Sequence, residues 1–355
     1  GFAEGVSGQV ETVGTVLVNG GTLITGANSL VGTGSTVRLE SGRTVISGGG
    51  MIQDQHIVLS GGENVIEGGG ALMVTPTQPG ATASGLELVG GSAALITIIG
   101  GATPGRFTIN NNISVNTSGG SALIASTGTG AQAGSVDLGS GVRTLTVDNG
   151  APGAGFVLQA SVANGGLVKQ GAGSLVLAGE TALNRGLALQ QGALELAPTA
   201  ALVSAGTGKI SFEGGSVRYA AGASQDISAL IAPVAAGQML KIDTNGQRVQ
   251  FATPVVGAGT LAVVGGTFGT VLVNGGNLTG GTLTADAYNL FSGTIGAQIA
   301  GSGTLTLSGN GTTIITSYNP LFTGKTFINS GTLQIGNGGG TSASVRSGVQ
   351  AQSGH

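Results

Sequence analysis

Short strand-like segments of nearly equivalent sequence, each closed by a glycine-rich turn, recur along this chain. The octapeptide GTVLVNGG stands at residues 14–21 and again, unchanged, at residues 269–276. Related segments read GSTVRLESGRTVISGGG, HIVLSGGENVIEGGG and GTLTLSGN. Val, Leu, Ile and Thr favour strands, and the NG, SG and GG pairs close them because Gly and Asn adopt positive φ. Equivalent strands that recur in this way indicate a solenoid rather than a globular sandwich.

The composition supports a folded β protein. The chain has 355 residues with 72 Gly and no Cys, and 40% of its residues are hydrophobic while 8% are charged. Disorder would require low hydrophobicity and high charge, and collagen would require Gly at every third position. The net charge of −3, with basic residues scattered singly, indicates no nucleic-acid partner. The longest apolar run, SAALITIIGG at 92–101, is strand-sized, so we expect no direct membrane insertion.

These observations predict an all-β fold, a parallel β-solenoid that forms a single elongated rod. Roughly 20 to 25 residues per coil give about 14 to 17 coils, and a spacing of about 4.8 Å per coil gives a length of about 70 to 80 Å. In the first octapeptide, Val16 and Val18 point inward, or alternatively Leu17 does, and Asn19 begins the turn. The solenoid is expected to span residues 1–337, followed by a Gly/Ser-rich linker or tail at 338–355.

A longer repeat stands out in the second half of the chain. GAGSLVLAGE begins at Gly171 and GSGTLTLSGN begins at Gly301, and each is followed by a second related frame, RGLALQQGALELA or GKTFINSGTLQIG. The interval from Gly171 to the Gly of GAL, Gly192, is shorter than the interval from Gly301 to the Gly of GTL, Gly331. We expect the loop TTIITSYNPLFTG to supply the difference.

The segment GSGTLTLSG…TGKTFINSGTLQIG resembles the autotransporter-associated β-strand repeat, which occurs in passenger regions of type V secreted bacterial surface proteins. TVRLESGRTVISGGG and IVLSGGENVIEGGG resemble the Ser/Gly-rich coils of AIDA-type adhesin passengers. The resemblance covers about residues 165–197 and 286–339, and more loosely residues 8–74. It implies a right-handed parallel β-helix outside the cell, at the outer membrane surface or released from it, with roles such as adhesion, fibre formation or biofilm building.

Few residues suggest chemistry, and we expect no catalytic, metal or cofactor site. Asp54 and His56 lie two apart in MIQDQHIVLS, so in one strand both would face the same side and point to solvent. Glu63 and Glu67, in the segment ENVIE, are the two carboxylates closest to each other in the sequence. We expect both to lie on the outer wall. Only two His are present, which leaves no convincing triad or multi-His metal site.

Two functional hypotheses remain open at this point. The favoured one is a non-enzymatic surface protein, an adhesin or a structural stalk or fibre. Its partners would be a host or bacterial surface, a matrix or glycan ligand, or other copies bound end to end through unpaired strand edges. The alternative is a β-helix enzyme acting on polysaccharide, which requires carboxylates and bases to converge, for example Asp54 with Arg38 or Arg43 on neighbouring coils.

One segment concentrates aromatic residues in a chain that otherwise has few. The segment GTTIITSYNPLFTGKTF contains a possible partner-contact loop formed by Tyr318, Pro320, Leu321 and Phe322. As a loop leaving the solenoid, it would offer apolar side chains to a partner. Under the alternative interpretation, Phe322 and Phe327 plug the core or pack the loop onto it.

Overall fold

The computed structural model describes residues 9–10, 15–27, 29–31, 36–75, 85–91, 93–129, 132–150, 153–203, 206–249, 251, 253, 255–256, 260–264, 267–279, 282–338, 343–345 and 349–351. In these residues short parallel strands stack as a β-solenoid of about 13 turns. None of these residues is in an α-helix, and no helix there is long and apolar enough to cross a bilayer. The predicted all-β solenoid is therefore confirmed.

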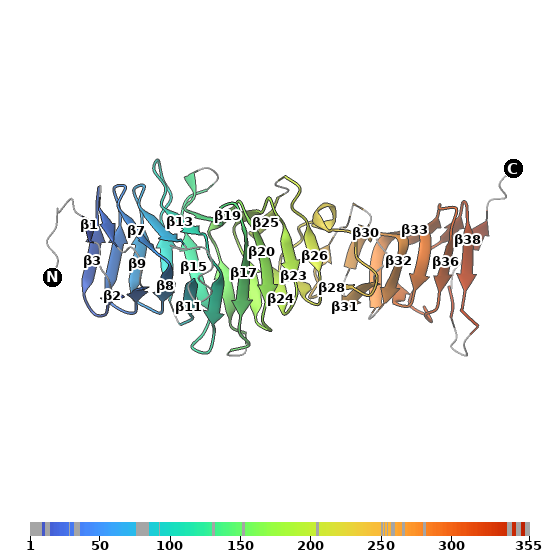
Figure 1. Cartoon of the computed structure of the whole chain (residues 1–355). Coiled ribbons are helices and arrows are strands. Elements are labelled where there is room, and N and C mark those ends of the chain that lie inside the picture. The colour runs from blue at the N-terminus through green and yellow to red at the C-terminus, as the bar shows by residue number, and fades with distance from the viewer. Residues whose placement is uncertain are drawn as a thin grey trace. The chain divides into compact units, whose positions relative to one another are not determined.

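The chain divides into two compact units, and each is described by itself. Unit 1 comprises residues 1–193 and 200–208, and unit 2 comprises residues 194–199 and 209–355. Strand β24 (Ala193–Leu196) begins in unit 1 and continues in unit 2. Figure 1 shows the strands lying side by side within each unit.

Unit 1 has three parallel sheets, and each coil adds one strand to each sheet in turn. Sheet A comprises β1 (Gln9–Val10), β4 (Leu30–Val31), β7 (Met51–Asp54), β10 (Ala71–Val74), β13 (Arg106–Ile109), β16 (Ser135–Asp137), β19 (Ser161–Ala163), β22 (Glu180–Ala182) and β25 (Ala201–Leu202). Sheet B includes β2 (Thr15–Val18), β5 (Thr36–Leu39), β8 (His56–Leu59), β11 (Leu86–Val89), β14 (Ile113–Asn116), β17 (Val142–Val147), β20 (Gly166–Gln170) and β23 (Leu187–Leu189). Sheet C includes β3 (Thr22–Thr25), β6 (Arg43–Ile46), β9 (Glu63–Ile66), β12 (Ile96–Ile98), β15 (Ala122–Ser126), β18 (Gly155–Leu158) and β21 (Ser174–Leu177).

Unit 2 continues the parallel arrangement with strands of more varied length. They are β26 (Ile210–Phe212), β27 (Ser216–Tyr219), β28 (Met239–Asp243), β29 (Arg248–Val249), β30 (Val255–Val256), β31 (Thr260–Val264), β32 (Thr267–Thr279), β33 (Thr282–Ile295), β34 (Gln298–Ala300), β35 (Thr304–Leu307), β36 (Thr312–Ile315), β37 (Thr326–Ile328), β38 (Thr332–Ile335) and β39 (Val349–Ala351). A 3-10 helix, η2 (Ser228–Leu230), precedes β28. Strands β32 and β33 pair around more than one corner, with register shifts next to Val273 and Asn274.

The coils are longer in the middle of unit 1 than at its start. Near the start Val37 pairs with Ile57 of the next coil, whereas in the middle Ile113 pairs with Leu145, which lies much further along the chain. The extra residues lie in corners between strands. Because of them, the solenoid has fewer turns than a uniform coil length predicted. Loop-length changes of this kind are tolerated because they leave the strand register intact.

The core consists mainly of inward-facing aliphatic residues stacked in columns, with a few buried aromatic rings such as Phe107 and Phe156. Ile57, Leu86, Ile113 and Leu145 follow one another up sheet B, and all are buried. Each fully buried side chain of this kind contributes about 1.5–3 kcal/mol to folding. The regular period-two burial explains why alternating Val, Leu and Ile marked these strands in the sequence.

The duplicated octapeptide has the same inward valine at both positions. In β2, Val18 is buried while Leu17 is 53% exposed, which decides between the two predicted orientations. In β32, Val273 is the counterpart of Val18 and is also buried. Gly20 has φ +81° and its counterpart Gly275 has φ +83°, so the repeated letters also give the same left-handed corner.

Part of the stretch expected to be a tail joins the stack. Strand β39 pairs in parallel with β37, with Val349 opposite Thr326. Ser344 contacts Asn319 through its hydroxyl and its carbonyl. These residues therefore belong to the fold of unit 2.

The expected loop at residues 312–324 contains a regular strand. Strand β36 occupies Thr312–Ile315 and pairs with β33 on one side and β38 on the other. The prediction that this whole stretch is an inserted loop is wrong. The glycine spacing alone could not distinguish an insertion from an extra strand, because both lengthen the interval between corners.

The glycine corners show which segments of the two repeats correspond. A Cβ on Gly331 would collide with the carbonyl oxygen of Gly309 and lie 2.7 Å from that of Gly311. A Cβ on Gly192 would likewise collide with Gly173 and lie 2.6 Å from the carbonyl oxygen of Gly171.

The corner at residues 171–173 of the first repeat therefore corresponds to residues 309–311 of the second repeat, not to residues 301–303. Measured from this corner, the interval to Gly331 in the second copy is nearly the same as the interval from the first corner to Gly192. The two repeats thus match closely in length, and the difference that the inserted loop was expected to supply disappears.

Candidate functional site

The predicted contact loop is the corner between β36 and β37. After β36 the chain crosses to Phe322, which forms a parallel bridge with Gly301 of the preceding coil. The amide of Gly301 donates to the carbonyl oxygen of Leu321 at 2.9 Å, and the amide of Thr323 donates to that of Gly301 at 2.8 Å. The backbone of this corner is therefore fixed on the coil below it.

Asn319 holds the corner from inside and is fully buried. Its Oδ1 accepts hydrogen bonds from the amide of Ile299 at 2.5 Å and the hydroxyl of Ser317 at 3.1 Å. Its Nδ2 donates to the carbonyl oxygens of Ser317 at 2.9 Å and Ser344 at 2.7 Å. Its own amide donates to the hydroxyl of Ser344 at 3.2 Å. One side chain thus joins three successive levels of the stack, and its polar atoms are satisfied in the interior.

Phe322 belongs to the core. It is 1% exposed and meets the buried Tyr288 edge to face, with ring centroids 6.0 Å apart and an interplanar angle of 78°. The hydroxyl of Tyr288 donates towards the carbonyl oxygens of Leu283 at 2.8 Å and Ala300 at 2.9 Å. Burial raises the pKa of Tyr288 to about 12, so the phenol stays a donor at neutral pH. Phe322 therefore anchors the corner and offers no surface to a partner.

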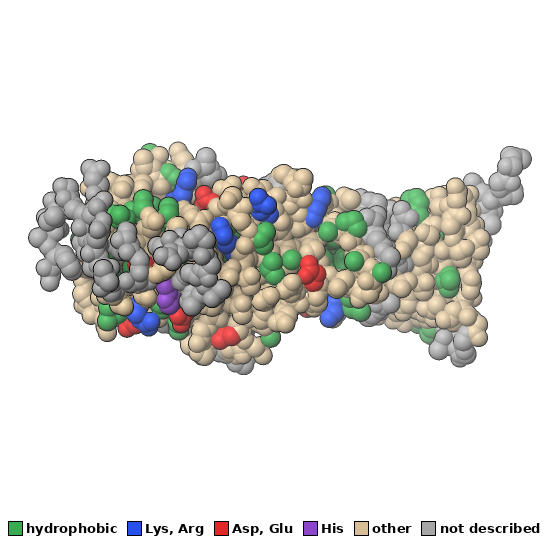
Figure 2. All heavy atoms as spheres, viewed as in Figure 1, with side chains coloured by type: hydrophobic (Ala, Val, Ile, Leu, Met, Phe, Trp, Pro, Cys, Tyr) green, Lys and Arg blue, Asp and Glu red, His purple; other side chains and the backbone are tan. Residues whose placement is uncertain are grey.

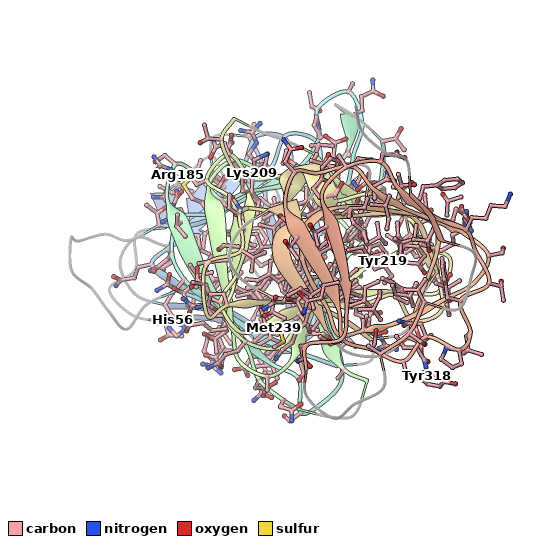
Figure 3. All side chains as sticks on the ribbon, turned by 90° about the vertical axis from the view of Figure 1, so that its right-hand side faces the viewer. His56, Arg185, Lys209, Tyr219, Met239 and Tyr318 are labelled. Carbon is pink, nitrogen blue, oxygen red and sulfur yellow. The ribbon has the colours of Figure 1, made fainter. Side chains whose placement is uncertain are left out.

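Tyr318 and Leu321 are the outward-facing members of the predicted loop. Each is 58% exposed, while Pro320 is half-buried. Tyr318 lies at the outer edge of unit 2 and Tyr219 lies inside it (Figure 3). The corner therefore presents one aromatic and one aliphatic side chain on a backbone that the core holds in place.

The structure separates the predicted acid/base pair. Asp54 ends β7 and His56 begins β8, so the chain turns between them and the alternation of a single strand does not apply. Asp54 is buried, and its Oδ1 accepts a hydrogen bond from the amide of Gln55 at 2.7 Å. His56 instead lies next to Glu87, with Nε2 3.7 Å from Oε2. The prediction that Asp54 and His56 point to solvent together is wrong.

The two arginines that served as the example of basic partners for Asp54 pair with other carboxylates. Arg38 binds Glu40 at 2.7 Å, and Arg43 binds Glu63 at 3.2 Å. Glu67 is partly exposed, as expected for the outer wall. Charged side chains are scattered on the face shown in Figure 2, and the described residues contain no cluster of three potential metal ligands. Exposed ion pairs of this kind contribute about 0–1 kcal/mol each.

Asn319 and Lys169 are among the buried polar residues that sequence reasoning missed. Lys169 is 0% exposed although it carries an amine. A signal was present in GLVKQG, because the lysine occupies the inward position two residues after Leu167. For Asn319 the SYNP segment gave only a turn signal, which does not reveal the direction of the side chain.

Comparison with known families identifies the two repeats. Residues 167–196 and 300–335 match the passenger-associated-transport-repeat. No curated protein and no solved structure matches the chain.

The repeats and the β-solenoid together fit the passenger region of an autotransporter. Passenger repeats imply a secreted passenger, which is consistent with an extracellular or cell-surface location. They also favour a structural role over an enzymatic one. The second repeat contains the corner that displays Tyr318 and Leu321, so the candidate contact lies within repeat structure rather than beside it.

Proposed function

We propose that this chain is a non-enzymatic adhesive stalk of a bacterial surface passenger, with Tyr318 and Leu321 as one of its contact points. The single observation behind this proposal is the corner held by Asn319, which fixes two exposed apolar side chains. A contact surface that is rigid before binding loses less conformational entropy on association. Aromatic side chains are also enriched among residues that dominate binding energy.

The parallel stack supports the stalk part of the proposal. Between the ends of the stack, strands are hydrogen-bonded to the coil before them and the coil after them, as β5 is to β2 and β8. The polysaccharide-enzyme hypothesis, for which Asp54 with Arg38 or Arg43 was the example of converging charges, has less support. Those arginines are engaged by Glu40 and Glu63.

The location and partners follow from the same proposal. The stalk acts outside the cell, attached to the outer membrane surface or released, and contacts a host or bacterial surface, a matrix or a glycan. End-to-end binding of copies through unpaired strand edges would extend it into a fibre. Electron microscopy over a concentration series tests this last part: filaments of constant width support it, and particles of one fixed length at every concentration contradict it.

Replacing both exposed side chains, Tyr318→Ser with Leu321→Ser, is expected to reduce adhesion at least about fivefold, since a few contact residues, often aromatic, carry most of the binding energy. Latex beads coated with the chain are scored on collagen, on mucin and on a layer of beads carrying the same chain. A matched control replaces Leu17 and Ile24, which are 53% and 46% exposed on unit 1, by Ser.

The outcomes separate the parts of the proposal. Equal loss in the two double variants would point to general stickiness rather than a contact at this corner. Absence of binding by the parent chain to all three surfaces would contradict the adhesive role. Side-chain replacement is preferable to deletion of residues 317–323, because deletion also removes Asn319 and its contacts with Ile299 and Ser344.

A further inference from the structure

Lys169 is a buried amine within an aliphatic column of unit 1. It is the fourth residue of β20 and is 0% exposed. Its partners in register are Leu145 on β17 and Leu189 on β23, both buried. A lysine is rarely buried completely unless it is paired, so this position calls for a physical account.

The amine lies against backbone carbonyl groups of two successive corners. Its Nζ donates to the carbonyl oxygens of Gln170 at 2.8 Å and Gly171 at 2.9 Å, just after β20. It also donates to that of Gln191 at 3.3 Å, in the corner of the next coil. Three donors of an ammonium group thus meet three acceptors, and none of these acceptors carries a formal charge.

The charged groups on the elements that pack against β20 are engaged elsewhere. On β17, Arg143 donates through Nε to the carbonyl oxygens of Ile109 at 3.2 Å and Leu138 at 3.1 Å. After β17, Asp148 accepts hydrogen bonds from the amide and hydroxyl of Thr117 at 2.7 and 2.6 Å.

In the coil that follows β20, the charged residues Glu180 and Arg185 are exposed. Within the described part of the chain, the hydrogen-bond partners of the Lys169 amine are therefore carbonyl dipoles and include no carboxylate. Burial lowers its pKa to about 8.

In the second repeat, the position that corresponds to Lys169 is uncharged. Counting two residues back from Gly309, as Lys169 stands before Gly171, gives Leu307, which is fully buried. The residue that corresponds to Gln191 is Ser330, and its hydroxyl donates to the carbonyl oxygen of Gly309 at 3.3 Å. An apolar residue with a serine hydroxyl therefore replaces the lysine amine.

We propose that the protonation state of Lys169 controls whether the corner of the first repeat is closed or open. We call this corner a proton-controlled joint. Burial penalises the ammonium form in the closed corner, so protonation shifts the corner towards an open state in which the ammonium reaches water, and loss of the proton favours the closed state. The second repeat, with Leu307 and Ser330, has no such joint. The device thus gives two repeats of one family different responses to pH.

The direction in which pH changes the stability of the closed corner follows from proton linkage. The closed state holds its lysine proton less tightly than the open state, where the pKa returns towards its ordinary value of 10.5. Between about pH 8 and pH 10.5 the open state therefore binds more protons, and raising the pH stabilises the closed corner. Below about pH 8 the amine is charged in both states and the full cost of its burial is present.

Hydrogen exchange on the full chain tests the joint. After correction for intrinsic exchange rates, we expect the opening of residues 187–192 to fall about tenfold or more between pH 7 and pH 9.5. The variant Lys169→Leu with Gln191→Ser, which copies the second corner, is expected to lose this dependence. Residues 305–331 serve as the internal control and should show no such change.

Direct titration of the lysine side chains tests the joint even if the double variant does not fold. The chain has four lysines, so their side-chain resonances can be assigned and followed by NMR in the parent protein. A lysine titrating near pH 8 that is absent from Lys169→Met supports the joint. Ordinary titration of all four lysines, or a pH response of residues 187–192 that survives in the double variant, overturns it.

Discussion

Replacing Asn319 with alanine is expected to lower the free energy of unfolding of unit 2 by about 3–5 kcal/mol, because each buried polar group left without a partner costs about 1–3 kcal/mol. The variant leaves the amide of Ile299 without its acceptor. It also leaves the carbonyl oxygens of Ser317 and Ser344 without the Nδ2 donor. The losses are not strictly additive, since the three groups share one network.

Urea unfolding of the full chain measures the effect, and hydrogen exchange shows whether the change is confined to residues 298–345. Asn329→Ala is a suitable control, because Asn329 is exposed at a nearby corner, and we expect it to change stability by less than about 0.5 kcal/mol. Equal urea midpoints for Asn319→Ala and the parent would show that the side chain does not hold the corner. A loss in adhesion as well would connect the corner's rigidity to its proposed contact.

Replacing Gly331 with alanine is expected to destabilise unit 2 by about 3–5 kcal/mol, because left-handed strain of about 1–2 kcal/mol adds to overpacking of about 1–3 kcal/mol. Gly331 has φ +80°, which disfavours any side chain with a Cβ. The new Cβ would also collide with the carbonyl oxygen of Gly309 and come within 2.7 Å of that of Gly311. Both obstacles are backbone atoms, so relief requires the stacked corners to separate.

A second glycine distinguishes strain from collision. Gly237 has φ +78°, but a Cβ there would meet nothing within 4 Å. Gly237→Ala should therefore cost only the conformational part, about 1–2 kcal/mol. If both variants lowered the urea midpoint equally, close stacking of the corners would not be the cause. Gly192→Ala should behave like Gly331→Ala, because its Cβ would collide with the carbonyl group of Gly173 in the same way.

The sequence alone determined the class of fold and the direction of many side chains. Alternating Val, Leu and Ile between glycine turns predicted stacked parallel strands, because a strand has a side-chain period of two. It also predicted the turn at Gly20, and the repeat frames predicted a passenger repeat, which matches the passenger-associated-transport-repeat in two segments. It left open whether Val18 or Leu17 points inward, which the structure decides. These features depend on local residue patterns, which a single chain displays in full.

Only the tertiary structure decided how the repeats correspond and which polar residues lie inside. The match of Gly309 with Gly171 depends on which corner lies over which, and spacing along the chain does not record that contact. Phe322 points inward because its bridge to Gly301 places it beside Tyr288, whereas Tyr318 stays outside on the same corner. Burial of a polar side chain is decided by the partners that other coils bring to it, and those partners are distant in sequence.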